Sequence, residues 1–188
     1  MTFATFSLTA IAIFLLGYVP FIPPWAVFIT WACFFHMDGG SDRKQGYMST
    51  VTHLWIGALG AWVTALLLLN SPFESSTANT LWSPLVIATV VAGLARLSTR
   101  PRFSVTPAII YGYAGLFAFT AAPGAFSLEK LISISFENAL ISIWVSVLLG
   151  AACGYINVVL IERLISIASK WQSWRKALAE KQTKVIHG

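Results

Sequence analysis

Residues 138–161 read NALISIWVSVLLGAACGYINVVLI and contain no charged side chain. A helix of about 20 apolar residues crosses the hydrocarbon core of a bilayer. Residues 1–35, 75–95 and 103–128 are also free of Asp, Glu, Lys and Arg. These long uncharged blocks predict an all-α protein whose helices lie in a membrane.

The composition of the 188-residue chain points to the same class. Hydrophobic residues make up 57% of the chain and charged residues 10%, whereas soluble proteins carry roughly 25% charged residues. A water-soluble domain and a disordered chain are therefore excluded. The two cysteines, Cys33 and Cys153, are too few for a disulfide-stapled secreted module, and neither has the histidine spacing of a zinc site.

Six apolar segments are separated by breaks rich in proline, glycine or charge, which predicts a polytopic bundle of about six transmembrane helices. The segments cover residues 3–19, 25–36, 48–69, 81–97, 106–120 and 138–161. We expect the first, which lacks a basic flank, to be a retained helix rather than a signal peptide. The second is short, since about 12 helical residues span about 18 Å against a core of about 30 Å. A segment that dips in and returns is the alternative, and it leaves the side of the N-terminus open.

The basic residues are unevenly distributed over the connections between these segments. With six crossings, the second loop, the fourth loop and the C-terminal tail share one side and, with Arg96 counted in the fourth loop, hold 11 of the 12 Lys and Arg residues. Lys130 falls on the other side. Because short cytoplasmic loops carry the excess of Lys and Arg, we predict a multi-pass protein of the bacterial inner membrane with a cytoplasmic C-terminus.

Two halves of the chain, residues 1–70 and 81–161, have the same layout. In each half a short aromatic segment begins at a proline, Pro24 or Pro107, and a longer span with small residues follows. The small-residue clusters are GALGAW at 57–62 and GAACGY at 150–155. Three helices per half give the halves opposite orientations, which predicts an inverted repeat with a binding site between its halves. Chance similarity is the alternative.

Residues 162–188 form a basic tail after the predicted transmembrane domain of residues 1–161. Apolar residues recur in the tail at spacings of three and four, at Leu164, Ile167, Trp171, Trp174 and Leu178, with basic residues between them. This pattern is typical of an amphipathic helix on an anionic lipid surface, and docking of a protein partner is the alternative. The net charge of +5 does not indicate nucleic acid, because the chain has almost no polar folded surface to present.

Residues 24–35 read PWAVFITWACFF and run into Gly39 and Gly40. This stretch resembles the aromatic segment and glycine loop of small bacterial inner-membrane proteins grouped as domain of unknown function 1097. The Gly- and Ala-rich last span and the basic tail are similar too, so the resemblance covers roughly the whole chain. The charged loop after Gly40 and the loop before the last span are longer here. The resemblance implies a multi-span inner-membrane protein and supplies no substrate, reaction or catalytic residue.

Several polar and aromatic residues inside the segments are candidates for a solute path. His53 lies about one turn inside the third segment, where an ionisable residue usually faces an interior or a water-filled path. A neutral histidine bonded to a neighbouring hydroxyl is the alternative. The aromatic residues of the second segment have two interpretations. They could line an apolar constriction, or they could contact lipid. The predicted path residues are His53, Trp31, Phe34, Phe35, Tyr111 and Asn157, although Asn157 also fits a structural hydrogen bond between helices.

Small residues recur every four positions in two of the spans. They are Gly57 and Ala61 in the third segment and Ser146, Gly150 and Gly154 in the sixth. Small residues let membrane helices approach closely. We therefore predict that these residues pack helices and that the third and sixth segments cross at the axis of the repeat.

Catalytic chemistry has little support in the sequence. His36, Asp38 and Asp42 lie close together, but one histidine with loop carboxylates is a weak metal signal. An Asp or Ser capping the next helix explains this loop equally well. We expect no metal, no cofactor and no catalytic residue, and a membrane enzyme using His36, Asp38 and His53 is the third-ranked hypothesis.

The leading hypothesis is a channel or facilitator for a small neutral or weakly ionised solute, with its path between the second and fifth segments. No acidic residue lies deep in a segment and no phosphate-binding motif occurs, which argues against ion-coupled transport through a carboxylate and against direct use of ATP. The alternative is a non-transporting accessory or scaffold subunit that binds a protein partner through its tail. A homo-oligomer is expected because six short helices make a thin bundle.

Overall fold

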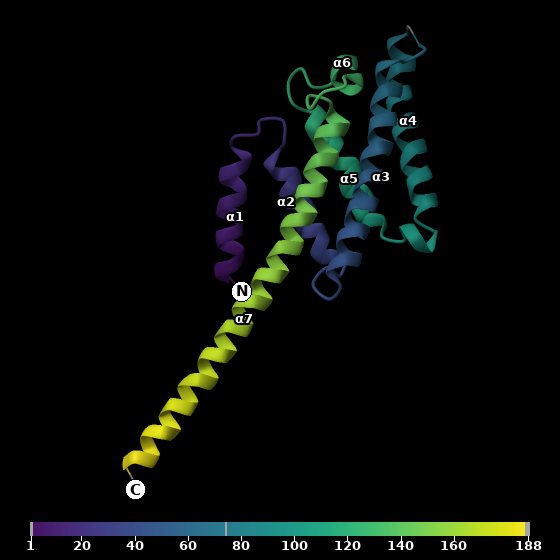
Figure 1. Cartoon of the computed structure of the whole chain (residues 1–188). Coiled ribbons are helices and arrows are strands. Elements are labelled where there is room, and N and C mark those ends of the chain that lie inside the picture. Colours follow the sequence, from purple (N-terminus) through teal and green to yellow (C-terminus); the bar gives the residue numbers. More distant parts are fainter. Residues whose placement is uncertain (1, 74, 187–188) are drawn as a thin grey trace.

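The computed structural model describes residues 2–73 and 75–186, with the side chains of 76, 79 and 176–186 outside the description. Over the described range every regular element is helical (Figure 1), which confirms the prediction of an all-α fold. The elements are α1 (Thr2–Leu16), α2 (Pro24–His36), α3 (Arg43–Leu69), α4 (Ser76–Leu97), the short 3-10 helix η1 (Pro101–Phe103), α5 (Thr106–Thr120), α6 (Leu128–Ile132) and α7 (Ala139–Ile186).

Three helical stretches are long and apolar enough to cross a membrane. They are Arg43–Leu69 with 27 residues, Thr80–Leu97 with 18 and Ala139–Arg175 with 37. Helices α1 and α2 are apolar but shorter, and the 13 residues of α2 span about 20 Å. The described helices are therefore those of a membrane protein, while the number of six crossings stays a prediction.

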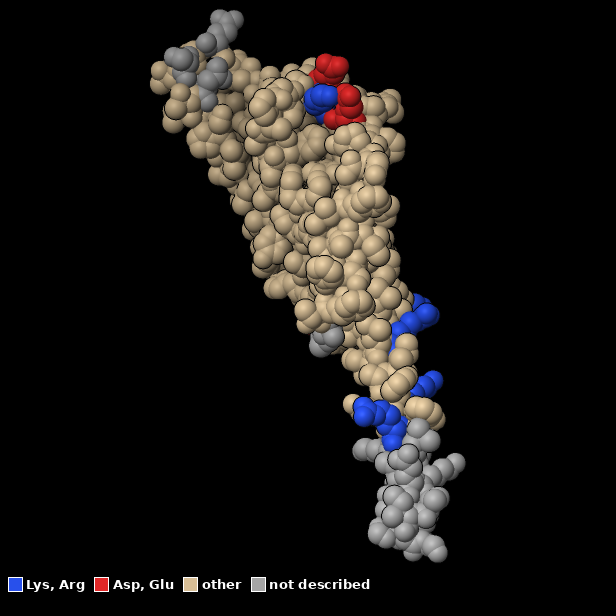
Figure 2. Space-filling model, turned by 90° about the vertical axis from the view of Figure 1, so that its left-hand side faces the viewer, with Lys and Arg blue, Asp and Glu red and all other residues tan. Residues whose placement is uncertain are grey.

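The main helices run alternately between two ends of the molecule (Figure 1). The connections after α1, α3 and α5 lie at one end, which we call the upper end. The connections after α2 and α4 lie at the opposite, lower end, where α7 leaves the bundle. Figure 2 shows acidic side chains and one basic side chain at the upper end, and the other visible basic side chains toward and beyond the lower end.

Side-chain caps define where two of the long helices begin. The Asp42 carboxylate accepts hydrogen bonds from the backbone N–H groups of Lys44 (3.1 Å) and Gln45 (3.0 Å), which confirms the capping interpretation of the loop before α3. The Asn138 side-chain oxygen accepts from the N–H of Leu140 at 2.8 Å and so starts α7. These caps satisfy backbone donors that the first turn of a helix leaves without partners.

Helix α3 lies at the centre of the bundle and packs against α5, α7 and α4, while α2 packs mainly against α7. The contact of α3 with α7 includes Trp55 and Trp144, whose rings stack with centroids 5.1 Å apart. The Trp55 indole N–H also donates to the Trp144 carbonyl at 3.1 Å. The two long helices therefore pack on each other near mid-length of α3, through tryptophans rather than through their glycines.

Helix α7 continues through position 161, where the sequence predicts the end of the transmembrane domain. It contains no glycine or proline after Gly154 that would bend it, and it projects beyond the lower end of the bundle (Figure 1). Residues 162–175 are exposed, including the predicted tail residues Trp171 and Trp174. Leu178 and the basic residues beyond Arg175 lie outside the described side chains.

Candidate functional site

Glycines bring the backbones of α3 and α5 into direct contact. A Cβ atom at Gly57 would overlap with the carbonyl of Ile109 on α5. A Cβ atom at Gly112 would overlap in the same way with the backbone of Leu54 on α3. The predicted packing residue Gly57 therefore holds α3 against α5.

The same kind of contact joins α7 and α2. A Cβ atom at Gly150 would overlap with the Val27 carbonyl, and one at Gly154 would overlap with the ring of Phe34. The other predicted packing residues, Ala61 and Ser146, are fully buried, and the Ser146 hydroxyl donates to the Ser142 carbonyl at 2.8 Å. Each short helix thus packs on the long helix of the other half of the chain.

The buried faces of α2 and α5 correspond position by position. The buried residues of α2 are Ala26, Val27, Thr30, Trp31, Cys33 and Phe34. Adding 82 to each of these numbers, as from Ala26 to Ala108, gives a buried residue of α5 in every case. The matching residues are Ala108, Ile109, Gly112, Tyr113, Gly115 and Leu116. Val27 and Ile109, whose carbonyls meet the glycines of α7 and α3, are one such pair.

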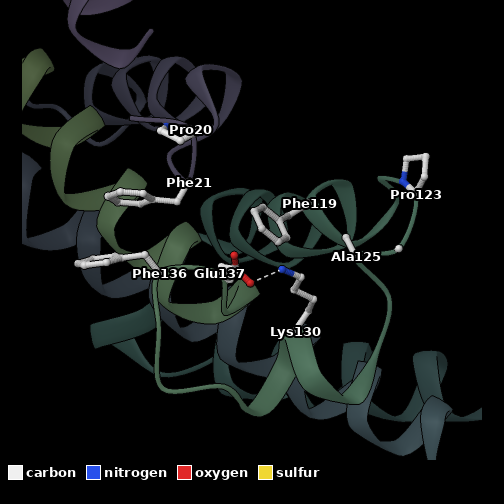
Figure 3. A pocket seen from close by; sticks show the side chains of 9 residues that line it. Pro20, Phe21, Phe119, Pro123, Ala125, Lys130, Phe136 and Glu137 are labelled. Carbon is white, nitrogen blue, oxygen red and sulfur yellow. Dashed lines mark hydrogen bonds and ion pairs between the residues drawn. The ribbon is translucent and has the colours of Figure 1, made fainter. Parts of the chain in front are cut away.

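Three hollows lie along the pair of helices α2 and α5. The upper one is a cavity of about 420 Å³ next to the start of α2 and the end of α5 (Figure 3). Its lining residues are Pro20, Phe21, Phe119, Pro123, Gly124, Ala125, Lys130, Phe136 and Glu137. Gly124 has φ +75°, a backbone conformation that favours glycine, so the turn in this wall depends on it.

Aromatic rings and one ion pair form the inner surface of the upper cavity (Figure 3). The rings of Phe21 and Phe136 stack with centroids 4.4 Å apart. The Lys130 ammonium lies 2.5 Å from the Glu137 carboxylate. The hydrogen bond and the positive charge of Lys130 lower the pKa of Glu137 below its usual range, so Glu137 is ionised at neutral pH.

Hydrogen bonds from neighbouring elements hold α6 and the residues just before α7, which carry Lys130 and Glu137, in place. Leu131 is fully buried, and its carbonyl accepts hydrogen bonds from the Trp62 indole at 2.7 Å and from the Asn138 amide at 2.9 Å. The Ser142 hydroxyl of α7 donates to the Phe21 carbonyl. The cavity walls are therefore held by α3 and α7 rather than by the loops alone.

The middle hollow lies further along α5, where Gly115 lines it and Phe119 lines the upper cavity, and it has a volume of only about 10 Å³. Its lining is apolar apart from two hydroxyl-bearing residues, Thr30 and Tyr111, and the Thr30 hydroxyl already donates to the Ala26 carbonyl at 2.8 Å. The lining residues are Trp25, Ala26, Ile29, Thr30, Leu54, Tyr111, Gly112, Gly115, Ile143 and Val147. This hollow is the constriction between α2 and α5.

The lower hollow continues from the constriction, because Ile29 and Tyr111 line both. It has a volume of about 430 Å³ and is also lined by Ala32, Cys33 and His36. Ile29 and Tyr111 are 43% and 44% exposed, so this hollow opens on the outer face of the two helices. The lower two hollows therefore adjoin, whereas the upper cavity shares no lining residue with either of them.

Of the six predicted path residues, Tyr111 lines the constriction and the lower hollow. Trp31 and Phe34 are buried, with Trp31 stacked on Phe28 at 6.0 Å and Phe34 against Gly154. They line none of the three hollows. The aromatic stripe of α2 therefore divides between the helix core and its outer face.

Phe35 and Asn157 line a separate hollow of about 680 Å³ beside α1. The Thr5 hydroxyl donates to the Asn157 side-chain oxygen at 3.3 Å, which joins α1 to α7. This bond matches the structural alternative for Asn157. Neither residue lines a hollow that Tyr111 lines, so the structure does not bring them together with Tyr111.

His53 is 4% exposed and lies in the core. Its Nδ1 is 2.7 Å from the Ser49 carbonyl, which makes Nδ1 the donor, and its ring lies 6.3 Å from that of Phe103. Its Nε2 is buried and has no hydrogen-bond partner among the described residues. The hydrogen-bond partner of His53 is therefore a backbone carbonyl, whereas the structural interpretation of the sequence expected a neighbouring hydroxyl. His53 lines none of the three hollows.

The sequence did not single out most of the upper cavity. Phe21 lies in the connection before α2, Phe119 near the end of α5, and Phe136 and Glu137 in the connection before α7, and nothing in their spacing brings them together. The available signal was Lys130, the one basic residue on its predicted side of the membrane. Across the described residues no group of three His, Cys, Asp or Glu side chains converges, His36, Asp38 and Asp42 included.

The fold and these hollows define a helical protein of the membrane type, built from two short helices cross-packed on two long ones. The chain belongs to the family described as "Protein of unknown function (DUF1097)", whose family model matches residues 4–161. This membership confirms the resemblance seen in the aromatic segment and the glycine loop. No curated protein and no solved structure matches the chain.

Proposed function

We propose that this protein is a channel or facilitator for a small neutral or weakly ionised solute. The observation that carries the proposal is the set of three hollows along α2 and α5, of about 420, 10 and 430 Å³. A path of this shape has a vestibule at the upper end, a narrow apolar gate and an exit at the lower end.

An inverted repeat explains why the path lies between the short helices. In the repeat, α2 corresponds to α5 and α3 corresponds to α7. The contact of Gly57 with Ile109 then corresponds to the contact of Gly150 with Val27. This correspondence also preserves the buried faces of α2 and α5. Transport sites of inverted repeats lie near the midplane, between the two halves.

The gate selects against ions. Its lining offers no charged side chain and few free polar groups, and moving an ion into such surroundings is very unfavourable unless the ion is paired. A hollow of about 10 Å³ is also at the lower limit for one water molecule. The path is therefore closed here, and it opens by small movements of Ile29 and Tyr111 that let water in.

The distribution of Lys and Arg supports the proposed membrane and the orientation of the protein in it. The lower end carries the basic connections, which favours a cytoplasmic lower end and C-terminus in the bacterial inner membrane. The upper cavity then faces outward. The open side of the lower hollow, with Ile29 and Tyr111 exposed, favours a homo-oligomer in which neighbouring copies close the path.

Solute flux into liposomes that contain the purified protein tests the proposal. Stopped-flow light scattering with urea, glycerol, ammonia and short carboxylic acids measures the rate. Ile29→Ala widens the gate and should raise the rate for at least one solute. Gly115→Leu should block it, because a Cβ atom at Gly115 meets only the Trp25 ring, at 4.0 Å, so the longer side chain fills the gate without breaking the helix contact.

Two controls separate gate effects from folding effects. Gly93→Leu makes the same change on α4, where a Cβ atom meets nothing within 4 Å, and should leave flux unchanged. His53→Ala should also leave flux per folded protein unchanged, because His53 lines none of the hollows. Rates equal to those of empty liposomes for every solute, in the wild type and in Ile29→Ala, would contradict the proposal.

A second candidate function is a scaffold subunit that binds a protein partner through the end of α7. The observation in its favour is the helix beyond Glu162, which projects from the bundle with Trp171 and Trp174 exposed. Stoichiometric co-purification of one protein, lost when residues 162–188 are removed, would support it. Flux that is independent of this segment would favour the facilitator.

A further inference from the structure

We infer that the upper cavity binds short monocarboxylic acids, with Lys130 holding the carboxylate, and that these acids are the solute. This inference rests on the proposed function and names its substrate class. The cavity combines three aromatic rings with the Lys130–Glu137 ion pair, and it lies on the upper side of the proposed gate. A small acid has the matching parts, a carboxylate and a short apolar chain.

Lys130 is the natural anchor for an anion at this end. Among the described Lys and Arg side chains it alone lines the cavity. Its side chain is 32% exposed, whereas that of its partner Glu137 is 68% exposed. An incoming carboxylate displaces Glu137 toward water, where an ionised carboxylate is well solvated. An incoming amine would instead displace the less exposed Lys130, so the cavity favours anions over cations.

The rings provide the second half of the recognition. Phe21 and Phe136 form a stacked wall on one side of the ion pair, and Phe119 lies near Lys130 on the other side (Figure 3). An alkyl chain of two to four carbons fits against these rings while its carboxylate reaches Lys130. The gate, at about 10 Å³, must open for any acid to pass, so the cavity rather than the closed gate sets the first selection.

The apolar gate requires the acid to cross in its neutral form. The carboxylate takes a proton from hydronium in the vestibule, which leaves water, and the neutral acid then leaves Lys130 and crosses. It returns the proton to water at the lower end, so each acid carries one proton across. Because Lys130 binds the anion, the concentration of the solute rises in the upper cavity. Because the acid crosses in its neutral form, no charge enters the gate.

Binding of butyrate to the full-length protein in detergent tests the role of Lys130. Isothermal titration calorimetry should give a butyrate affinity that Lys130→Gln weakens at least about tenfold, as expected for loss of a charge-assisted hydrogen bond. Lys130→Arg should keep the affinity within a few-fold. Glu137→Gln should raise it, because the internal competitor for Lys130 is removed. Lys170→Gln, on the exposed part of α7, is the matched control and should have no effect.

Two outcomes would overturn the inference. One is butyrate binding that is absent or is equal in the wild type and in Lys130→Gln, with both proteins folded by thermal melting. The other is tighter binding of butylamine than of butyrate, lost in Glu137→Gln, which would make the cavity a cation site.

Flux separates this inference from the proposed function. Liposomes with an internal pH dye should acidify on addition of acetate or butyrate, faster with the wild type than with Lys130→Gln. Flux of urea or glycerol without butyrate binding would leave the facilitator standing and overturn the acid site. Lys130-dependent butyrate binding without flux of any solute would establish the site and overturn the facilitator.

Discussion

At the residue scale, four glycines decide how closely the helices of this bundle approach. Gly57 and Gly112 lie in the contact of α3 with α5, and Gly150 and Gly154 in that of α7 with α2. A methyl group at Gly57 or Gly112 meets backbone atoms, which cannot move aside as a side chain can. The helices would have to separate, and the constriction between α2 and α5 depends on their positions.

Gly57→Ala should therefore lower the stability of the protein. We expect a loss of about 1–3 kcal/mol, the range for overpacking in a tight core. Thermal melting in detergent measures it. Gly93→Ala is the matched control, since its methyl group meets nothing within 4 Å and alanine favours a helix over glycine, so its melting temperature should hold or rise. Equal melting temperatures for the two variants would contradict the close backbone contact.

At the scale of elements, α6 and the start of α7 form one unit around Asn138. The Asn138 amide donates to the carbonyls of Leu131 and Ser133, while its oxygen starts α7. The Lys130–Glu137 ion pair closes the same loop from outside. This unit forms one wall of the upper cavity, so its order controls the shape of the vestibule.

Acid should loosen this unit. Lys130 lowers the pKa of Glu137 in the folded protein, so the ion pair stabilises the fold above the usual pKa of glutamate and is lost as the pH falls through the lowered value. Hydrogen exchange of residues 128–138, corrected for intrinsic rates, should show less protection at about pH 3 than at about pH 6. The effect is small, because both groups are partly exposed.

Glu137→Gln should remove this pH dependence. Glu129→Gln is its matched control, because Glu129 lies beside Lys130 in α6 without pairing with it among the described ion pairs. If the pH dependence survives in Glu137→Gln but disappears in Glu129→Gln, Glu129 rather than Glu137 causes it, and the prediction is wrong.

At the scale of the whole molecule, the two ends differ in charge and the helices alternate between them (Figures 1 and 2). With six crossings, every upper connection faces one side of the membrane and every lower connection faces the other. The lower end also carries the ion pair between Arg43 at the start of α3 and Glu162 of α7, with the Arg43 guanidinium 5.7 Å from the Tyr155 ring. This pair joins the bundle to α7 where α7 leaves it.

Single cysteines should report this arrangement directly. In a background with Cys33 and Cys153 replaced by alanine, Ala122→Cys lies in an exposed upper connection and Ser41→Cys in an exposed lower one. A membrane-impermeant maleimide added to intact cells should label Ala122→Cys, and Ser41→Cys only after the membrane is opened. Labelling of both from outside would rule out the alternating topology, and the reverse pattern would invert the orientation.

The sequence by itself determined the class of this protein, the place of its main apolar segments and its family. Those properties depend on local quantities: the length of an uncharged run, the position of a proline, the placement of Lys and Arg. Pro24 marks the start of α2 in the sequence and in the structure, whereas α3 begins at Arg43, before the predicted apolar segment of residues 48–69. The family follows from the aromatic segment that begins at Pro24.

Only the tertiary structure decided which faces of these helices meet. Tyr111 and Phe35 are both aromatic residues on short apolar helices, yet one lines the constriction and the other a hollow beside α1. In a uniformly apolar helix, hydropathy does not distinguish the packed face from the exposed one. Backbone contacts at Gly57 and Gly150 set that rotation, and the same packing brings Phe21, Phe119 and Phe136 together from two connections and the end of α5.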